Sequence, residues 1–355
     1  MTGRRTTSRL VAVLAALALT LTGCSRLSSH QGGGAAHPVI GFTVYNMTSY
    51  ITLGKAGVDR EAQALGAQVL WRTANNDVNN QVSQLQSFIN QGVDAIVIAP
   101  VNAATLKPEI EQARAKGIPV FITNLTLDQP MSGMTQSYVG ADDVAAGEQE
   151  MRAMAQSLGG KGNIVLLQGP LGGSGEIDRT KGVLQELAKY PGIHLLAQQT
   201  ADWDRNEAYN VMNNWLSAFG TKIDAVVSEN DDMAIGSLRS LATRGLVGKT
   251  KVVGIDGLQD ALDRVRSGEM IATNLQNAPL QLGMAVAVAV RGVRGQAYPK
   301  EALMTMPLVT KSNVDVIYDR LYTHRDAYFQ TLPQLIESNL SSGDYGRQSL
   351  TDPAS

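Results

Sequence analysis

The segment Lys222–Leu241, KIDAVVSENDDMAIGSLRSL, decides the fold of this chain. Its first part, Ile223–Ser228, is a short apolar run rich in valine, which is typical of a strand buried on both faces of a parallel sheet. The polar group Glu229–Asp232 interrupts this run, and the apolar spacing after it predicts a helix. Either aspartate of the polar group could cap that helix, because a carboxylate accepts hydrogen bonds from the free N–H groups of the first turn.

Two further strands repeat this arrangement. Lys251–Ile255 is apolar and is followed by Asp256, and Met270–Leu275 is followed by Gln276. Asn230 occupies the same place after the first strand. Open α/β sheets bind their ligands at the carboxyl ends of parallel strands. We therefore expect Asn230, Asp256 and Gln276 to point into one crevice.

Strand and helix patterns alternate from residue 39 onward in two series that meet near residue 141, which predicts two lobes with helix-covered parallel sheets. The expected strands are Val39–Val44, Ala67–Trp71, Asp94–Ala99, Ile118–Thr123, Asn163–Gln168, Ile193–Gln199, Ile223–Ser228, Lys251–Ile255, Met270–Leu275 and Leu303–Val309. The expected helices are Leu53–Leu65, Val78–Gln91, Ala103–Lys116, Asp142–Leu158, Gly175–Lys189, Arg205–Phe219, Pro279–Arg294 and one from Val314 that packs on the outside. The tail after Ser341 has no apolar pattern, which is typical of disorder.

The composition excludes several classes of function. The 355 residues are 44% hydrophobic and 17% charged, which suits two globular domains. The net charge of −2 provides no basic field, so we expect no nucleic-acid partner. The four histidines lack the spacing of metal ligands, and the sequence contains no G-x-S-x-G motif. We therefore expect no catalytic residues, no metal and no cofactor, and hence no enzyme.

The N-terminus has the features of a secretory signal peptide over residues 1–23, in which arginines precede the apolar run Leu10–Leu19. This run is too short to span a membrane comfortably. Cys24 is the only cysteine of the chain and follows Leu21–Gly23, where a bacterial lipoprotein signal places its lipidated residue. The alternative is ordinary cleavage beside a chance cysteine. After the lipidated Cys24, the stretch to residue 38 is rich in Ser, Gly and Ala and predicts a flexible tether.

The motifs AVVSENDDMAIGSL (Ala225–Leu238) and VVGIDG (Val252–Gly257) resemble the second lobe of periplasmic sugar-binding proteins of the ribose/galactose type. Those proteins are soluble receptors of ABC importers, and the resemblance extends from Val39 to about Asn313. It implies a type I periplasmic binding protein, in which two Rossmann-like lobes with parallel sheets are joined by a three-strand hinge. The implied parts are residues 39–140 plus 277–305 as the N-terminal lobe, 141–276 plus 306–340 as the C-terminal lobe, and 341–355 as a tail.

A sugar or polyol needs fork-shaped hydrogen-bonding partners for vicinal hydroxyls and an aromatic ring against its C–H face. Arg179 follows the glycine-rich loop Gly169–Gly175 and is similar to the family's Arg-x-x-Gly, and its guanidinium can donate to two hydroxyls. The alternative pairs Arg179 with Asp178 or Glu176 on a helix surface. The loop lacks the Gly-Lys-Ser/Thr ending of a phosphate-binding loop, so we expect its backbone to pass close to a ligand.

Trp203 lies in a motif similar to the family's strand-end motif in which an aromatic covers the sugar, although it could instead cover the edge of the lobe. In the first lobe, Tyr45 and Tyr50 follow the first strand, where the family places aromatic contacts. Asn124 stands where ribose-type relatives carry Asp, and the next residue, Leu125, stands where they carry Arg. These departures leave the identity of the sugar open.

The resemblance implies a substrate-binding lipoprotein of an ABC importer that closes on a small neutral sugar or polyol. We expect a monomer, lipid-anchored at the outer face of the cytoplasmic membrane, that docks on an ABC permease. The ligand is expected to be uncharged because Arg179 and Asp256 can balance each other. The alternative function is a ligand-sensing lipoprotein that acts on a chemoreceptor or sensor kinase. The expected ligand-binding residues are Tyr45, Tyr50, Asn124, Arg179, Trp203, Asn230, Asp256 and Gln276.

Overall fold

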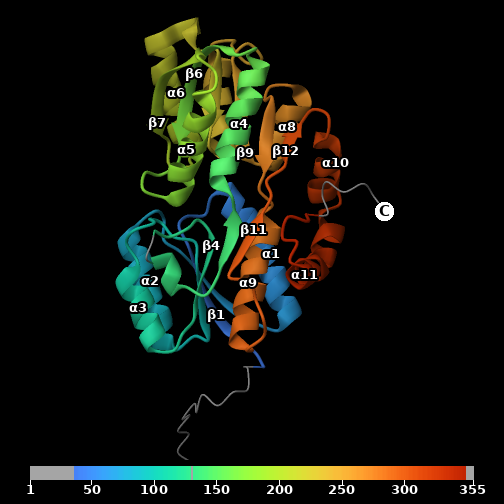
Figure 1. Ribbon diagram of the computed structural model, residues 1–355. Coiled ribbons are helices and arrows are strands. Elements are labelled where there is room, and N and C mark those ends of the chain that lie inside the picture. Colours follow the sequence, from blue (N-terminus) through green and yellow to red (C-terminus); the bar gives the residue numbers. More distant parts are fainter. Residues whose placement is uncertain (1–35, 129–130, 349–355) are drawn as a thin grey trace, which may run out of the picture. The chain divides into compact units, whose positions relative to one another are not determined.

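The computed structural model describes residues 36–128 and 131–348, which form two α/β lobes, each around a six-stranded sheet (Figure 1). The predicted signal peptide, Cys24 and the tether up to residue 35 lie outside the described residues. Neighbouring strands are parallel in both sheets except for one antiparallel pair at the edge of the second sheet. The predicted fold class, two lobes with mostly parallel sheets, is thus confirmed.

The first sheet has the strand order β11-β5-β4-β3-β1-β2. Its strands are β1 (Val39–Val44), β2 (Gln68–Thr73), β3 (Ala95–Ile98), β4 (Val120–Asn124), β5 (Tyr138–Ala141) and β11 (Glu301–Met304). The helices around it are α1 (Ser49–Leu65), α2 (Val78–Gln91), α3 (Lys107–Ala115) and α9 (Ala278–Val293), with a short 3-10 helix at Met131–Met134. Helix α9 is apolar over nearly its whole length because it is buried between the sheet and α1.

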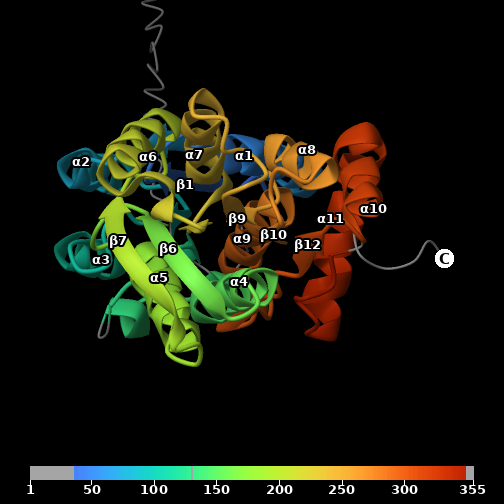
Figure 2. The same ribbon diagram turned by 90° about the horizontal axis from the view of Figure 1, so that it is seen from above.

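The second sheet has the strand order β12-β10-β9-β8-β6-β7. Its strands are β6 (Lys161–Gln168), β7 (Gly192–Thr200), β8 (Ala225–Ser228), β9 (Lys251–Asp256), β10 (Ala272–Leu275) and β12 (Leu308–Thr310). The helices around it are α4 (Asp143–Ser157), α5 (Ser174–Leu187), α6 (Arg205–Phe219), α7 (Asp231–Thr243) and α8 (Gln259–Ser267), with a 3-10 turn at Gly220–Lys222. Figure 2 shows α6, α7 and α8 side by side along one side of this lobe.

The segment predicted as one strand, Leu303–Val309, is two strands in different sheets. Strand β11 pairs with β5 of the first sheet, and β12 pairs with β10 of the second. The chain crosses between the lobes at Pro307, which has no N–H group to continue a ladder. The other two crossings lie between β5 and α4 and between β10 and α9.

The start of α7 corrects one prediction. Neither Asp231 nor Asp232 caps this helix; Asn230 is the N-cap residue, and its Oδ1 accepts a hydrogen bond of 2.9 Å from Met233 N. Asp232 instead accepts a hydrogen bond from Ser49 Oγ of the first lobe. An amide oxygen caps a helix as well as a carboxylate does, so the aspartates are free to make contacts between segments.

The end of the chain covers both lobes through α10 (Val314–Tyr318), the π-helix η3 (Asp319–Thr323) and α11 (Arg325–Ser342). Helix α10 packs on α8 of the second lobe, whereas α11 packs on α1 and α9 of the first. Helix α11, which the resemblance assigns to the C-terminal lobe, thus lies against helices of the N-terminal lobe. The expected disorder after Ser341 is wrong up to residue 348, since Gln348 is 2% exposed and donates to Thr305 O.

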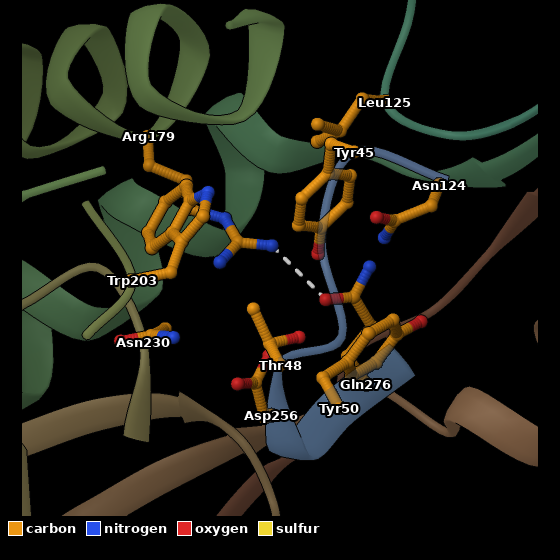
Figure 3. A pocket seen from close by; sticks show the side chains of 10 residues that line it. All are labelled: Tyr45, Thr48, Tyr50, Asn124, Leu125, Arg179, Trp203, Asn230, Asp256 and Gln276. Carbon is orange, nitrogen blue, oxygen red and sulfur yellow. Dashed lines mark hydrogen bonds between the residues drawn. The ribbon is translucent and has the colours of Figure 1, made fainter. Parts of the chain in front are cut away.

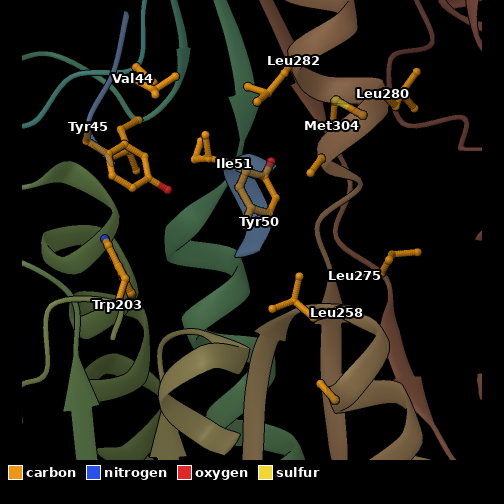
Figure 4. Close-up of a cluster of buried hydrophobic side chains, with 14 of the residues drawn as sticks. Val44, Tyr45, Tyr50, Ile51, Trp203, Leu258, Leu275, Leu280, Leu282 and Met304 are labelled. Carbon is orange, nitrogen blue, oxygen red and sulfur yellow. The ribbon is translucent and has the colours of Figure 1, made fainter. Parts of the chain in front are cut away.

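One apolar cluster runs through the contact between the lobes (Figure 4). Ile51 and Leu282 come from α1 and α9 of the first lobe, and Leu258 and Leu275 come from the ends of second-lobe strands and their loops. All four side chains are buried. The polar strand-end residues therefore lie beside a continuous apolar support.

Two buried acids hold loops at the carboxyl edge of the second sheet. Glu229 accepts hydrogen bonds from Gly169 N at 2.8 Å and from Thr180 Oγ1 at 2.5 Å. Asp231 accepts one from Leu258 N at 2.9 Å. Burial, which disfavours the charged form, raises the pKa of Glu229 and of Asp231 to about 8.

Helices α1 and α9 are in close contact at Gly57, where a Cβ atom would lie 2.2 Å from the backbone oxygen of Pro279. We expect Gly57→Ala to lower the free energy of unfolding by about 1–3 kcal/mol, because the helices must move apart. At Gly283, in the same contact, a Cβ would meet the flexible end of Ile336 at 3.0 Å and the backbone oxygen of Gly57 at 3.3 Å. Gly283→Ala is the matched control: both variants gain the helix propensity of alanine, about 1 kcal/mol, but only Gly57→Ala forces a Cβ far inside contact distance of a backbone atom, so Gly283→Ala should cost less. Equal losses in urea titrations would contradict this account of the contact.

The buried acids predict that stability falls as the pH rises. The folded chain keeps protons on Glu229 and Asp231 up to about pH 8, whereas the unfolded chain releases them at the ordinary values of 4.5 and 3.8. Their contribution is complete below about pH 4 and is lost as the pH rises through about 8. Each group lowers the free energy of unfolding by at most about 1.4 kcal/mol per pH unit over this range. Burial also raises the pKa of Glu61 to about 8, so the wild-type slope includes this group.

Urea unfolding from about pH 5 to about pH 8.5 measures this slope. Glu229→Gln mimics the protonated acid and should flatten the dependence. The exposed Glu111→Gln should leave it unchanged. A wild-type stability that rises with pH over this range, or an unchanged slope in Glu229→Gln, would show that the acid is ionised in the folded protein.

Candidate functional site

A pocket lies where the two lobes meet and encloses about 280 Å³ that protein atoms leave empty, part of it open to solvent (Figure 3). In this conformation the lining side chains leave room for about one water molecule, so a larger ligand requires them to move apart. The structure brings all eight residues predicted to bind a ligand to this one pocket, together with two more. The lining residues are Tyr45, Thr48, Tyr50, Asn124, Leu125, Arg179, Trp203, Asn230, Asp256 and Gln276.

The topology explains why these residues meet. Asn230 and Gln276 directly follow β8 and β10, and Asp256 is the last residue of β9. In the first lobe, Tyr45 follows β1, and Asn124 is the last residue of β4. The carboxyl ends of parallel strands in each lobe therefore face those of the other lobe across the pocket.

Three pocket residues have a left-handed or otherwise unusual backbone. Asn124 has φ 63°, Trp203 has φ 60° and Asp256 has φ 134°, and they are half of the six described non-glycine residues with positive φ. Such conformations cost about 1–3 kcal/mol each and concentrate at sites where function requires a particular side-chain direction. The strain singles out this pocket from the rest of the described chain.

Arg179 is the central donor of the pocket and is 3% exposed. Its Nε donates to Asp143 Oδ1 at 2.8 Å, its Nη1 to Glu229 O at 2.5 Å and its Nη2 to Gln276 Oε1 at 3.0 Å. The guanidinium also lies 5.5 Å from the centre of the Trp203 ring. Arg179 is thus fixed by both polar and aromatic neighbours.

These contacts correct two sequence predictions. Arg179 pairs with neither Asp178 nor Glu176, which were the surface alternatives, and its ion-pair partner is Asp143. Burial alone would lower the pKa of Arg179, but the charges of Asp143 and Asp256 outweigh it and raise that pKa, so the arginine stays cationic. Since Asp143 already balances Arg179, Asp256 is not required as the counter-ion.

Two acceptor oxygens of the pocket have no hydrogen-bond partner among the described residues, namely Asn124 Oδ1 and Asp256 Oδ2. Burial and the nearby Asp231 raise the pKa of Asp256 well above its ordinary value. A buried acceptor without a donor costs about 1–3 kcal/mol. Both oxygens are therefore prepared to receive hydrogen bonds from a ligand.

Asn230 contributes only a donor. Its Oδ1 is used in capping α7, so Nδ2 is the group left to reach a ligand. The interpretation of Asn230 as a helix cap and its interpretation as a site residue are thus compatible.

Gln281 supports the pocket from behind and was missed by the sequence analysis. It is 1% exposed, and its Oε1 accepts hydrogen bonds from Tyr50 OH, Asn124 Nδ2 at 3.2 Å and Gln276 Nε2 at 3.4 Å. One acceptor thus orients three lining side chains. The signal in the sequence was a lone polar residue in the first turns of the otherwise apolar α9.

The glycines of the loop before α5 make room for side chains of the pocket. A Cβ at Gly169 would lie 2.0 Å from the Trp203 ring, and a Cβ at Gly175 would lie 2.8 Å from Leu125 Cδ2. At these two positions the indole and the leucine occupy the space beside the backbone. The expectation that the loop backbone passes close to a ligand stays a prediction.

The two lobes are in contact around the pocket through hydrogen bonds that the sequence did not predict. The bonds join Ser49 Oγ to Asp232 Oδ1 at 2.9 Å, Thr126 N to Ser174 Oγ at 2.7 Å, and Ala103 N to Gly172 O at 3.1 Å. This is the arrangement of a closed cleft. Asn102, nearby in the first lobe, accepts a hydrogen bond from Ala104 N through its Oδ1 and does not line the pocket.

Other features limit the chemistry of the described chain. Across residues 36–128 and 131–348, no group of three or more His, Cys, Asp or Glu side chains could hold a metal ion. Within the same ranges, no helix combines the length and apolarity needed to span a membrane. The pocket offers hydrogen bonds, one compensated cation and an indole ring, which are means of binding.

Two comparisons with known proteins match most of the chain. A family model described as a periplasmic binding protein domain matches residues 40–297. A xylitol-binding protein of Mycolicibacterium smegmatis is 48% identical over 335 residues, which cover 94% of each chain.

Two solved structures extend the comparison. An ABC transporter solute-binding protein from Bacillus halodurans, solved with bound myo-inositol, has 32% identity and a TM-score of 0.77, and the match covers 83% of this chain and 100% of that one. The fructose-binding periplasmic domain of a hybrid two-component system has 29% identity and a TM-score of 0.77, and covers 85% and 100%. With its two-lobed fold, its pocket and this extent of similarity, the chain belongs to the periplasmic binding protein family.

Proposed function

We propose that this protein binds a small, uncharged polyol or sugar between its lobes and delivers it to an ABC permease, without chemical change. The observation that carries the proposal is the pair of unpartnered acceptors, Asn124 Oδ1 and Asp256 Oδ2. Vicinal hydroxyl groups can donate to both and can accept from Arg179 and Asn230 in return. The indole of Trp203 offers the flat apolar face that C–H groups require.

The charges of the pocket favour a neutral ligand. The buried ion pair of Arg179 with Asp143 leaves the arginine no excess charge for a carboxylate or phosphate. Burial raises the pKa of Asp256, and the positive charge of Arg179 already lies close to this carboxyl, so a cationic ligand is disfavoured. Leu125 adds an apolar wall where a second cation would otherwise help an anion. A buried unpaired ion would cost several kcal/mol, so an ionic ligand is disfavoured.

Xylitol is the first ligand to test. The relative from Mycolicibacterium smegmatis is named a xylitol-binding protein and shares nearly half of its residues with this chain over almost the full length. A five-carbon polyol carries a hydroxyl on every carbon, which suits the donors and acceptors of the pocket. The solved relative with bound myo-inositol makes cyclic polyols the second class to test.

The importer role and the membrane anchor are parts of the same proposal. A named relative is the solute-binding protein of an ABC transporter. Lipidation at Cys24, after Leu21–Gly23, would keep the receptor at the outer face of the cytoplasmic membrane beside its permease. The chain of residues from Cys24 to the first strand would then serve as the tether.

A sensor role is the second candidate, because a relative of equal structural similarity is the fructose-binding periplasmic domain of a two-component system. Uptake of radiolabelled xylitol separates the two roles. Cells that lack this protein should lose uptake if it serves an importer. They should keep uptake but lose a transcriptional response to xylitol if it serves a sensor.

Removal of the unpartnered acceptor should weaken binding. We expect Asp256→Ala to weaken xylitol binding by about 1.5–3 kcal/mol, since a buried hydrogen-bond partner is lost. Asp256→Asn keeps one acceptor oxygen and should lose less. The exposed Asp260→Ala, on α8 of the same lobe, is the control and should bind as the wild type does. Isothermal calorimetry measures all four proteins; equal affinities in all of them would place the ligand elsewhere.

The anchor has its own test. Metabolic labelling with a fatty acid should mark the wild-type protein, which should then partition into detergent. Cys24→Ala should abolish both, because lipid chains at the cysteine supply the membrane affinity. Label that persists in Cys24→Ala, or no label in the wild type, would rule out a lipid anchor at this residue.

A further inference from the structure

The C-terminal segment of the chain, residues 314–348, lies beyond the region that matches the family model, which ends at residue 297. We call this segment the extension. Figure 1 shows its helices, in red, along one side of both lobes. Its apolar side chains Val314, Leu321, Leu332 and Ile336 belong to the cluster that runs between the lobes. The extension is therefore an integral part of the fold.

The first half of the extension is attached to the second lobe. Gln259 Nε2 of α8 donates to Tyr318 OH at 3.0 Å, and Arg266 of α8 forms an ion pair with Asp315 at 2.8 Å. Both contacts join α8 and α10, which are neighbours in the same lobe.

The second half is attached to the first lobe and to the hinge. Arg291 of α9 forms an ion pair of 2.7 Å with Glu337, and Arg60 Nε of α1 donates to Phe329 O at 3.0 Å. Gln348 Nε2 donates to Thr305 O, in the crossing between β11 and β12. The extension is thus a fourth connection between the lobes, beside the three hinge crossings.

The extension reaches the ligand pocket at its bend. The π-helix η3 joins α10 to α11, and Tyr322 within it donates from its hydroxyl to Gly257 O at 2.9 Å. π-helical turns often occur at functional positions. Gly257 directly follows the pocket residue Asp256. The bond from Tyr322 therefore holds the carbonyl group of a turn in which Asp256 has φ 134° and Gly257 has φ 73°.

Two other groups hold the same turn. Gly257 N donates to Thr273 Oγ1 at 3.2 Å, and Leu258 N donates to Asp231 Oδ2 at 2.9 Å. Both groups belong to the second lobe, whereas Tyr322 comes from the segment that continues to the first lobe. A strained backbone persists only where its surroundings determine it, and Tyr322 is the third of these determinants.

A second tyrosine repeats this arrangement at the hinge. Tyr328 OH, on α11, donates to Asn277 Oδ1 at 3.0 Å. Asn277 is the N-cap residue of α9 and directly follows the pocket residue Gln276. The extension therefore contacts the sequence neighbours of two pocket residues, Gly257 from its π-helix and Asn277 from α11.

We propose that the extension positions the ligand site: Tyr322 holds the Asp256–Gly257 turn in its strained conformation, and the helix after it ties that turn to the first lobe. Tyr322 is a positioning residue, since it does not line the pocket. When its hydroxyl is removed, the turn relaxes, Asp256 Oδ2 leaves its position, and the lobes separate more easily. The effect on affinity rests on the proposed function, whereas the effect on the lobes does not.

The test compares two tyrosines of the extension. Tyr322→Phe and Tyr318→Phe each remove one hydroxyl, and Tyr318 bonds only within the second lobe in the contacts described above. With xylitol as the probe, we expect Tyr322→Phe to weaken binding at least about five-fold, chiefly through faster dissociation. Tyr318→Phe should change affinity less than about two-fold, although both variants lose similar thermal stability. Equal affinities in the two variants would overturn the proposal.

A measurement without ligand tests the tie between the lobes. In the full chain with Cys24→Ala, cysteines introduced at Gln86 and Gln185 are the only thiols, and both positions are exposed, one on each lobe. Spin labels there report the distance between α2 and α5. We expect a broader, longer distance distribution in Tyr322→Phe than in the wild type or Tyr318→Phe.

The xylitol affinity tests the proposed ligand and the extension together, whereas the distances between the labels test the extension alone. If the wild type binds no xylitol, that ligand assignment fails, and the distances alone decide on the extension. Distance distributions that are the same in the wild type and both tyrosine variants would then overturn the inference.

Discussion

The buried guanidinium of Arg179 is the interaction on which the rest of the site depends. It joins Asp143, at the start of α4 after the first hinge crossing, to Gln276, at the second crossing, and to the backbone oxygen of Glu229 at the end of β8. Because a buried cation must be paired, these segments cannot drift apart without a large cost. The ion pair also neutralises the positive charge of Arg179 in the pocket before any ligand binds.

This pairing changes how substitutions of Arg179 must be interpreted. Loss of one partner of a buried ion pair costs about 3–5 kcal/mol, because the other charge stays buried and uncompensated. From the sequence alone, Arg179 was expected to donate to ligand hydroxyls, or else to pair with Asp178 or Glu176 on a helix surface. The structure places it inside a network, so Asp256, with its free acceptor oxygen, is the cleaner probe of binding.

Much of the fold could be predicted because local signals and tertiary packing agree. The bounds of α2 and α6 match the prediction, since Asp77 and Asp204 cap their first turns and glycines follow their last residues. Helix α3 starts later than predicted, at Lys107, because Pro108 suits a first turn and not a helix interior. The strand predicted over residues 303–309 could not be divided from the pattern alone, since both halves are extended and only their partners differ.

The part of the site that depends on strand ends could be predicted from the sequence, whereas its contacts between distant segments could not. Polar residues after successive parallel strands must meet, which places Asn230, Asp256 and Gln276 together whatever else the chain does. Contacts between distant segments carry no such local signal. Arg179 and Asp143 are 36 residues apart, and Tyr322 lies 65 residues from Gly257. Which donor meets which acceptor is decided by the tertiary packing of these segments.

The most direct test of the central claim is a crystal structure of the protein grown with xylitol. The account predicts xylitol in the pocket between the lobes, with its hydroxyl groups within hydrogen-bonding distance of Asn124 Oδ1 and Asp256 Oδ2 and its carbon chain against Trp203. The Arg179–Asp143 ion pair should remain as it is in the structure described here. A complex with the ligand bound elsewhere, or in the pocket with both oxygens still unpartnered, would contradict the account.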